Sequence, residues 1–121
     1  MATEFINYQA QNIGTTKYHM IDGAVDDGTT NPTGLTGLDT GKAQIMVGCM
    51  VANIKTTSVE ATVSIRNGAT VTRLVKSVTI PAGDAVEVVQ GKVVMEAGDE
   101  IEVSANSATA LDCVVSVLKN A

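Results

Sequence analysis

The sequence predicts an all-β protein: a single antiparallel β-sandwich or jelly-roll-like domain of about seven to eight strands. Short segments alternate apolar and polar residues, turn sequences separate them, and no segment has sustained helical periodicity. Apolar residues make up 45% of the 121, which is typical of a globular domain. Because only two Tyr and one Phe are aromatic, we expect a core of aliphatic side chains.

The chain divides into three parts within one domain. Residues 1–21 are expected to form an extended N-terminal arm or edge strands, with weak strand patterns at 5–11 and 15–21. Residues 22–41 are dense in Gly, Asp and Thr and predict a long Gly/Asp-rich loop. Residues 42–121 are expected to form the β-sandwich core.

The clearest strand pattern covers residues 59–66, where small apolar residues alternate with polar ones. Asn67-Gly68 follows, and this pair favours a tight hairpin turn because both central residues need positive φ. A strict two-residue turn pairs Ile65 with Thr70, which fits the apolar pattern imperfectly. A bulge that shifts the register is the alternative.

A short internal similarity relates residues 80–88 to residues 95–103. Each copy has an apolar residue, an Ala-Gly-Asp turn and an alternating strand. Two such turns predict a β-meander and not a solenoid, which needs three or more repeats.

The strands at residues 42–53 and 111–118 supply most of the predicted core. In the last strand, Val114 and Leu118 fall on the face opposite the core, which a subunit contact would cover. The residues expected to face the core are Ala43, Ile45, Val47, Cys49, Val51, Leu111, Cys113, Val115 and Val117, with Gln44 and Met46 pointing away.

No catalytic residue is identified. His19, the only histidine, has no partner pattern and is expected at the surface or a strand edge. Cys49 and Cys113 have apolar neighbours and are expected to be buried free thiols. We therefore expect a protein that is not an enzyme.

We also expect no cofactor and no metal. The acidic residues of the long loop do not match a calcium-binding pattern, and the glycines lack phosphate-loop spacing. The loop residues concerned are Asp22, Asp26, Asp27 and Asp39. A second carboxylate group, Asp99, Glu100 and Glu102, is expected to form a charged outer face.

The charge pattern bears on partners and location. A net charge of −5 argues against general nucleic-acid binding, and the longest apolar run, near residues 45–52, is too short to span a membrane. No secretory signal is recognisable at residues 1–9, so synthesis in a cytoplasm is expected. Basic residues cluster at Lys55, Arg66, Arg73 and Lys76, and acidic ones at Asp84, Glu87, Glu96, Asp99, Glu100 and Glu102. These clusters are either ordinary solvated charges or surfaces that meet between subunits.

All three aromatic residues lie within the first 18 positions. This is either chance in a small sample or the mark of an arm that docks on a partner, since aromatic residues are enriched at interfaces. The predicted interface residues are Phe5, Tyr8, Tyr18, Val114, Leu118, Arg66 and Arg73.

The C-terminal two-thirds of the sequence resembles small virion proteins of tailed bacteriophages. The similar segments are residues 45–53, 59–65, the Ile-Pro-Ala-Gly-Asp turn at 80–84, residues 94–101 and the closing strand at 111–118. The long loop and the aromatic N-terminal segment depart from that pattern.

The resemblance implies a virion structural protein made in the bacterial cytoplasm. The leading expectation is a capsid decoration (cement) protein that bridges subunits of the major capsid protein or another virion protein, as a homo-oligomer and in particular a trimer. The alternative is a neck, tail or fibre component that acts as a connector or binds the host surface. No nucleic-acid or membrane partner is expected.

Overall fold

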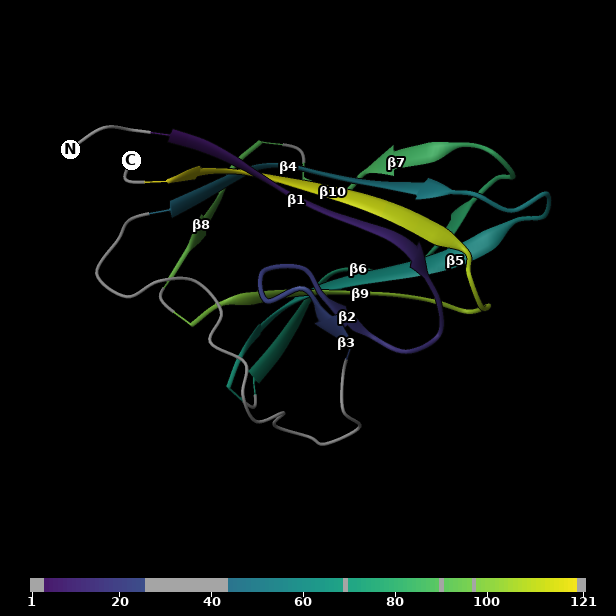
Figure 1. Ribbon diagram of the computed structural model, residues 1–121, viewed down its shortest axis with the longest axis horizontal. Coiled ribbons are helices and arrows are strands. Elements are labelled where there is room, and N and C mark those ends of the chain that lie inside the picture. The colour runs from purple at the N-terminus through teal and green to yellow at the C-terminus, as the bar shows by residue number, and fades with distance from the viewer. Residues whose placement is uncertain (1–3, 26–43, 69, 90, 97, 120–121) are drawn as a thin grey trace.

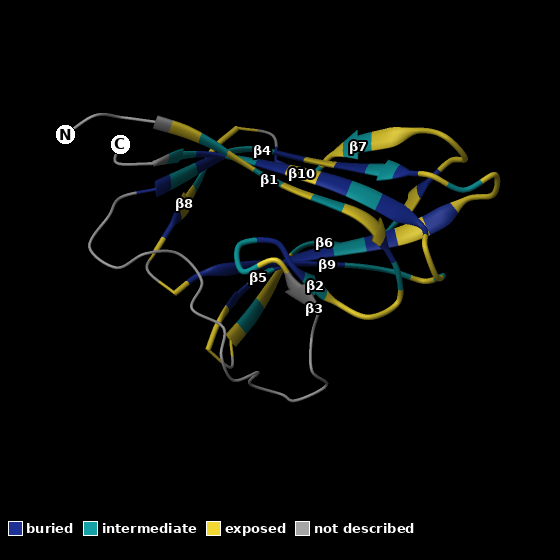
Figure 2. Ribbon diagram, in the orientation of Figure 1, coloured by how far each residue is buried: buried dark blue, intermediate teal, exposed yellow. Residues whose placement is uncertain are grey.

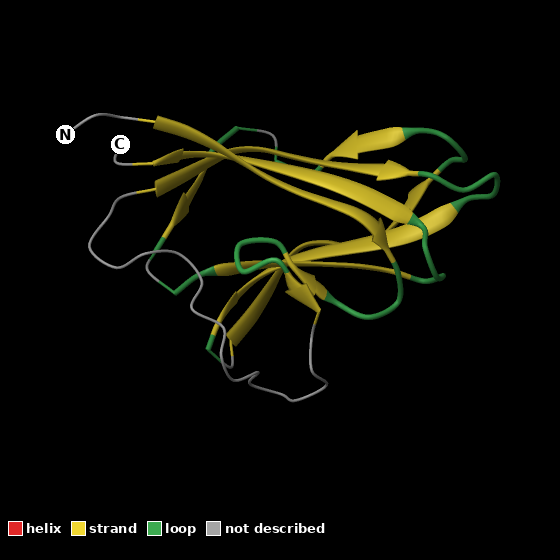
Figure 3. Cartoon of the chain, viewed as in Figure 1, coloured by secondary structure: helices red, strands yellow, loops and turns green. Residues whose placement is uncertain are grey.

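The computed structural model describes residues 4–25, 44–68, 70–89, 91–96 and 98–119, and every regular element in these ranges is a β-strand. The predicted all-β sandwich is confirmed, because two antiparallel sheets pack face to face (Figures 1 and 3). The strands are β1 (Glu4–Ile13), β2 (Tyr18–His19), β3 (Ala24–Val25), β4 (Gln44–Asn53), β5 (Val59–Asn67), β6 (Thr70–Ile80), β7 (Ala85–Glu87), β8 (Val93–Met95), β9 (Glu100–Ala105) and β10 (Leu111–Lys119).

Each sheet joins segments that are distant in the sequence. The first sheet has the order β1-β10-β4-β7, with β8 also paired to β4, and the second has the order β3-β2-β9-β5-β6. The N-terminal segment therefore supplies an edge strand, β1, to the first sheet. Strand β3 lies inside the segment predicted to be only loop. The rest of that loop, residues 26–43, falls outside the described residues.

The core lies between the sheets, where Figure 2 shows buried residues on the facing strands. The predicted alternation of β10 is confirmed: its inward side chains are at most 1% exposed. The buried apolar side chains of this core are aliphatic, Met and Cys residues, as the composition predicts. The largest apolar ones are Met46, Ile80, Met95, Ile101 and Leu111.

The predicted facing of β4 is wrong for its first half. A register shift against β10 occurs where Ser116 pairs with Gly48 and Val117 pairs with Met46. This bulge reverses the alternation, so Gln44 and Met46 are buried. Ile45, expected in the core, is instead partly exposed on the other face of the sheet.

The hairpin between β5 and β6 contains the bulges that the apolar pattern required. Ile65 pairs with Thr72 and not with Thr70, and the pairing has two register shifts, both between Ala61 and Ser64. Ser77, in the shifted part of β6, has a φ of 52° and donates its backbone N–H to the Thr62 hydroxyl at 3.0 Å. The shifts bring the apolar side of β6 onto the core.

The two Ala-Gly-Asp segments form similar turns, but the predicted meander is wrong. Asp84 donates its N–H to the Pro81 carbonyl at 3.0 Å, and Asp99 donates its N–H to the Glu96 carbonyl at 3.1 Å. Gly83 has a φ of 71°, which the third position of such a turn requires. Because β6 and β9 belong to the second sheet and β7 and β8 to the first, each turn carries the chain from one sheet to the other.

Asn53 holds the first of these crossings in place. Its buried side-chain amide donates to the carbonyls of Thr57, Ile80 and Pro81 at 2.8, 2.9 and 3.2 Å. Its side-chain oxygen accepts the Lys55 N–H at 2.8 Å. One side chain thus ties the end of β4 to the turn that follows β6.

We predict that Asn53→Ala lowers the free energy of unfolding by about 3 kcal/mol, because it leaves several backbone groups without partners. Urea unfolding of the purified protein measures the change. Asn106→Ala is the matched control, since exposed Asn106 accepts a single bond, from the Glu60 N–H, and should cost about 1 kcal/mol. Equal costs for the two variants would contradict the anchoring role of Asn53.

Candidate functional site

An apolar row crosses the outer face of the first sheet. Phe5 pairs with Leu118, Leu118 with Ile45, and Ile45 with Val94, so the four side chains lie side by side on β1, β10, β4 and β8. Phe5 is 77% exposed and Val94 is 73% exposed. We call these four residues the apolar row.

A second, shorter apolar pair lies further along the same face. Val114 pairs with Met50, and they are 40% and 50% exposed. Gln9 flanks Val114 on β1, and Glu87 flanks Met50 on β7. Apolar side chains are therefore exposed at two positions along this sheet face.

The first sheet is also nearly uncharged. Among the described side chains of its strands, only Asp112 and Glu87 carry charge. Each carboxylate accepts a hydrogen bond from the backbone of a neighbouring strand. Asp112 accepts the Asn12 N–H at 3.0 Å, and Glu87 accepts the Cys49 N–H at 2.7 Å. Apolar area without charge repulsion suits this face for contact with another protein surface.

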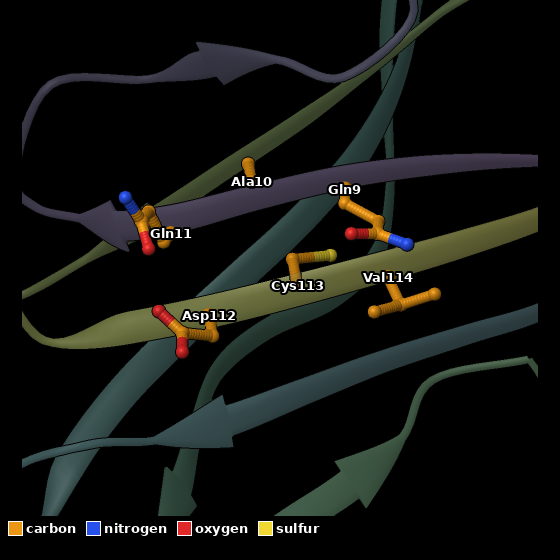
Figure 4. Close-up of a pocket in the computed structure, with 6 residues that line it drawn as sticks. All are labelled: Gln9, Ala10, Gln11, Asp112, Cys113 and Val114. Carbon is orange, nitrogen blue, oxygen red and sulfur yellow. The ribbon is translucent and has the colours of Figure 1, made fainter.

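A shallow groove of about 350 Å³ runs between β1 and β10 on this face (Figure 4). The side chains of Gln9 and Val114 lie beside each other there, and the carboxylate of Asp112 lies near Gln11. The groove is lined by Gln9, Ala10, Gln11, Asp112, Cys113 and Val114.

The predicted interface residues do not form one surface. Phe5, Val114 and Leu118 share the outer face of the first sheet, as described above. Tyr8 and Tyr18 are half-buried and pack against the core. Ile45, Val94 and Met50 complete the outer face, and the sequence analysis missed them; the β4 bulge that exposes Ile45 leaves no clear sequence pattern.

The two predicted arginines lie in the second sheet, in different surroundings. Arg73 is exposed on β6. Arg66 is buried: its Nε donates to the Glu102 carboxylate and its Nη1 donates to the Gly68 carbonyl at 3.1 Å. Arg66 and Glu102 come from the basic and acidic clusters and pair within one chain, so neither is available to a second subunit.

Glu102 is the centre of a buried group of charges and not part of an outer charged face. His19 pairs with it across β2 and β9, with Nδ1 at 3.5 Å from Glu102 Oε2. Lys17 Nζ lies 3.9 Å from the other carboxylate oxygen. His19 is completely buried, and its strand β2 lies between β3 and β9, so its expected place at the surface or a strand edge is wrong. Within the described residues neither of its ring nitrogens makes a hydrogen bond.

Glu100 is buried beside this group and also contradicts the expected outer face. Its carboxylate accepts the backbone N–H groups of Ile21, Asp22 and Ile101. Burial raises the pKa of Glu100 to about 7, against the opposing effect of these three N–H donors. Asp99 is also buried, and it accepts bonds from the Asn67 amide and the Glu96 N–H, both at 2.8 Å.

The predicted burial of both cysteines is confirmed, and both are free thiols. They lie on the neighbouring strands β4 and β10, offset by two residues, since Cys113 pairs with Val51 and Cys49 with Val115. The hydrogen bond with Cys49 is the main cause that raises the pKa of the Cys113 thiol, and burial is the second. Such a thiol stays protonated and is a poor nucleophile.

The described part of the chain contains no group of three His, Cys, Asp or Glu side chains placed to hold a metal ion. Of the acidic loop residues considered above, Asp26, Asp27 and Asp39 lie outside the described residues. Within the same ranges, no helix has the length and apolar character needed to cross a membrane.

No family model matches the chain, and no curated protein matches it. Among solved structures, it is similar to the crystal structure of the Podospora anserina GH26-CBM35 β-(1,4)-mannanase, with 18% identity and a TM-score of 0.47. The similarity covers 97% of this chain but only 28% of that chain. A likeness this distant carries no argument about function.

We predict that Arg66→Ala destabilises the fold by about 3 kcal/mol or more, because it leaves the buried Glu102 carboxylate without its closest partner. Arg73→Ala, the matched control on the exposed neighbouring strand, should change stability by less than about 0.5 kcal/mol. Thermal and urea unfolding measure both. Similar small effects for the two variants would show that Arg66 is not a structural residue.

We further predict that Glu100 makes the protein less stable as pH rises. Its folded pKa of about 7 exceeds the ordinary 4.5, so its contribution is fully present below pH 4.5 and is lost as pH rises through 7. The loss is about 3 kcal/mol at most.

Urea unfolding between pH 5 and pH 8, in the range of this titration, tests the effect. The difference in unfolding free energy between the wild type and Glu100→Gln should change with pH, and that between the wild type and Glu96→Gln, an exposed control, should not. A Glu100→Gln difference that is constant with pH would contradict the assignment.

Proposed function

We propose that this chain is a non-catalytic structural protein of a bacteriophage virion, which stabilises the shell as a capsid decoration protein. The observation that carries the proposal is the apolar row on a nearly uncharged sheet face. An exposed row of this kind loses contact with water when it docks on another protein, and the burial of Phe5 and Val94 would favour that contact.

Two further observations support an assembly role. The turn and strand segments of the C-terminal two-thirds resemble small virion proteins of tailed phages, as set out above. The buried charged residues Arg66 and Glu102 pair with each other within the fold. The Cys113 thiol has a raised pKa, so it is a poor nucleophile. A shell offers many identical sites, so a modest contact repeated symmetrically stabilises the whole particle.

Cryo-electron microscopy of intact virions tests the proposal by locating the chain in the density. Density at three-fold or quasi-three-fold positions of the capsid would support decoration, including the expected trimer. Density at the neck, tail or a fibre would favour the alternative, a connector or a host-surface binding module. Absence of the chain from purified particles would refute a structural role.

We predict that the apolar row mediates docking. Shells that lack the protein should gain heat resistance when the wild-type protein is added, but gain little with Phe5→Asp/Val94→Asp, because the two carboxylates must be desolvated on docking. Both positions are more than two-thirds exposed, so the variant should fold normally.

The matched control is Thr79→Asp, an exposed position on β6 of the second sheet. It should protect shells as the wild type does. Co-sedimentation with the shells and the temperature of shell disruption are the two measurements. Full protection by Phe5→Asp/Val94→Asp would place the docking surface elsewhere on the molecule.

A further inference from the structure

A polar pocket of about 390 Å³ lies at the end of β1 that is remote from the apolar row. The end of β1, the following loop and the turn before β10 form it. Its size is within the range of small-molecule sites. Its polar lining comes from Gln11, Asn12, Thr15, Thr16, Tyr18 and Thr109.

The chain has a net charge of −5, yet none of the described residues that line this pocket is Asp, Glu, Lys, Arg or His. Two side-chain amides, three Thr hydroxyls and one Tyr phenol contribute the polar groups. Amides and hydroxyls can each donate and accept hydrogen bonds. A ligand with many neutral hydroxyl groups matches such a lining, whereas an anion or a cation finds no opposite charge there.

Tyr18 adds an aromatic surface to these polar groups. Tyr18 is partly buried against the core, it lines the pocket, and its hydroxyl lies near Gly23. A tyrosine presents an apolar ring together with a polar tip. Sugar rings have the complementary pattern, with apolar C–H faces and hydroxyl edges.

Backbone strain is concentrated at this pocket. The described residues include three non-glycine residues with positive φ, and two of them, Asn12 at 58° and Thr109 at 50°, line it. For the β-branched Thr109 this conformation is costly, and such strain persists only where the surroundings enforce it. The third residue, Ser77, lies on β6 and does not line the pocket.

Close packing holds the two strained segments together. A Cβ added to Gly14 would lie 3.3 Å from the backbone of Ala108 and Thr109, so the loops are in near contact. Gly14 and Ile13 also accept backbone bonds from Ala105 and Ala110, at 2.8 and 2.9 Å. The lining is thus part of a rigid framework, which favours preorganised binding.

We propose that this pocket binds a neutral carbohydrate. The groove between β1 and β10 adjoins it, since Gln11 lines both, and it adds the Gln9 amide and the Asp112 carboxylate along the same path. The ligand is therefore an oligosaccharide that extends from the pocket along β1. The pocket begins roughly 20 Å from the apolar row along β1, whereas the groove shares the outer face of the first sheet with that row.

The first experiment screens the full-length protein on a glycan array that contains neutral oligosaccharides, with sialylated and sulfated glycans for comparison. The strongest neutral binder is then titrated into isotope-labelled protein and followed by NMR. We expect amide shifts at Gly14, Thr15 and Thr109. Gln11→Ala should weaken binding about tenfold, the effect of one lost hydrogen bond to the ligand.

The variant Thr109→Gly distinguishes a binding site from a turn that is strained but binds nothing. Glycine adopts positive φ without cost, so the variant should unfold at a higher temperature than the wild type and yet bind the sugar about tenfold more weakly. Ser77→Gly is the matched control: it relieves the same kind of strain on β6, and should raise stability without changing binding.

The proposal is refuted if no neutral glycan binds, if only charged glycans bind, or if Gln11→Ala and Thr109→Gly bind as the wild type does. These results concern the isolated protein, and so they leave the virion role untouched. Conversely, absence of the chain from virions would leave a measured sugar affinity intact.

Discussion

The contact between Arg66 and Glu102 is the constraint on which the buried outer side of the second sheet depends, because it joins β5 to β9 where a carboxylate is buried. Strand β9 is buried on both sides, with Ile101 and Val103 toward the core and Glu100 and Glu102 on the opposite side. A buried carboxylate is tolerated only with a charged partner or several hydrogen bonds. Glu102 has Arg66, and Glu100 has three backbone N–H donors.

This arrangement places the buried ion pair in the second sheet, while the described side chains of the first sheet carry only two charges, on Asp112 and Glu87. The turn after β2 is tied to β9 through Glu100, and β5 is tied to β9 through Arg66. On the outer face of the first sheet most described residues are uncharged, and the two carboxylates there, Asp112 and Glu87, each accept a backbone N–H. With only these two described charges, the outer face of the first sheet loses little charge hydration when it contacts another surface.

The sequence was sufficient for the fold class because alternation is a local property. Strand β10 follows period two without interruption, and its predicted inward and outward sides are both correct. The predicted facing of strand β4 is wrong because of one bulge, which places Gln44 and Met46 inward and Ile45 outward. A bulge depends on the partner strand, here on the pairing with Ser116, so no pattern within β4 reveals it.

The sequence also could not predict which polar residues are buried or which turns connect the two sheets. Glu100 and Glu102 alternate with apolar residues, as an exposed face would, and only the packing of β2 and its turn against β9 shows that they are buried. The paired Ala-Gly-Asp turns were recognisable as turns, but whether a turn keeps the chain in one sheet or carries it to the other depends on which strands pair afterwards. The candidate surface was only partly predictable for the same reason, because strand pairing is not visible in the sequence. Phe5, Val114 and Leu118 were predicted as interface residues. Ile45 and Val94 lie beside them only because of the register between neighbouring strands.

The two ends of β1 differ in a way that packing alone does not require. At one end, Phe5 is exposed beside aliphatic neighbours on an uncharged face. At the other end, the strand leaves its register between Ala10 and Ile13, and Asn12 takes a positive φ opposite the strained Thr109. A chain selected only for stability would place glycine at both strained positions, since glycine adopts this conformation without cost. Asn12 and Thr109 instead carry polar side chains that can hydrogen-bond a ligand at the proposed pocket, while the opposite end of β1 contributes Phe5 to the apolar row proposed for docking.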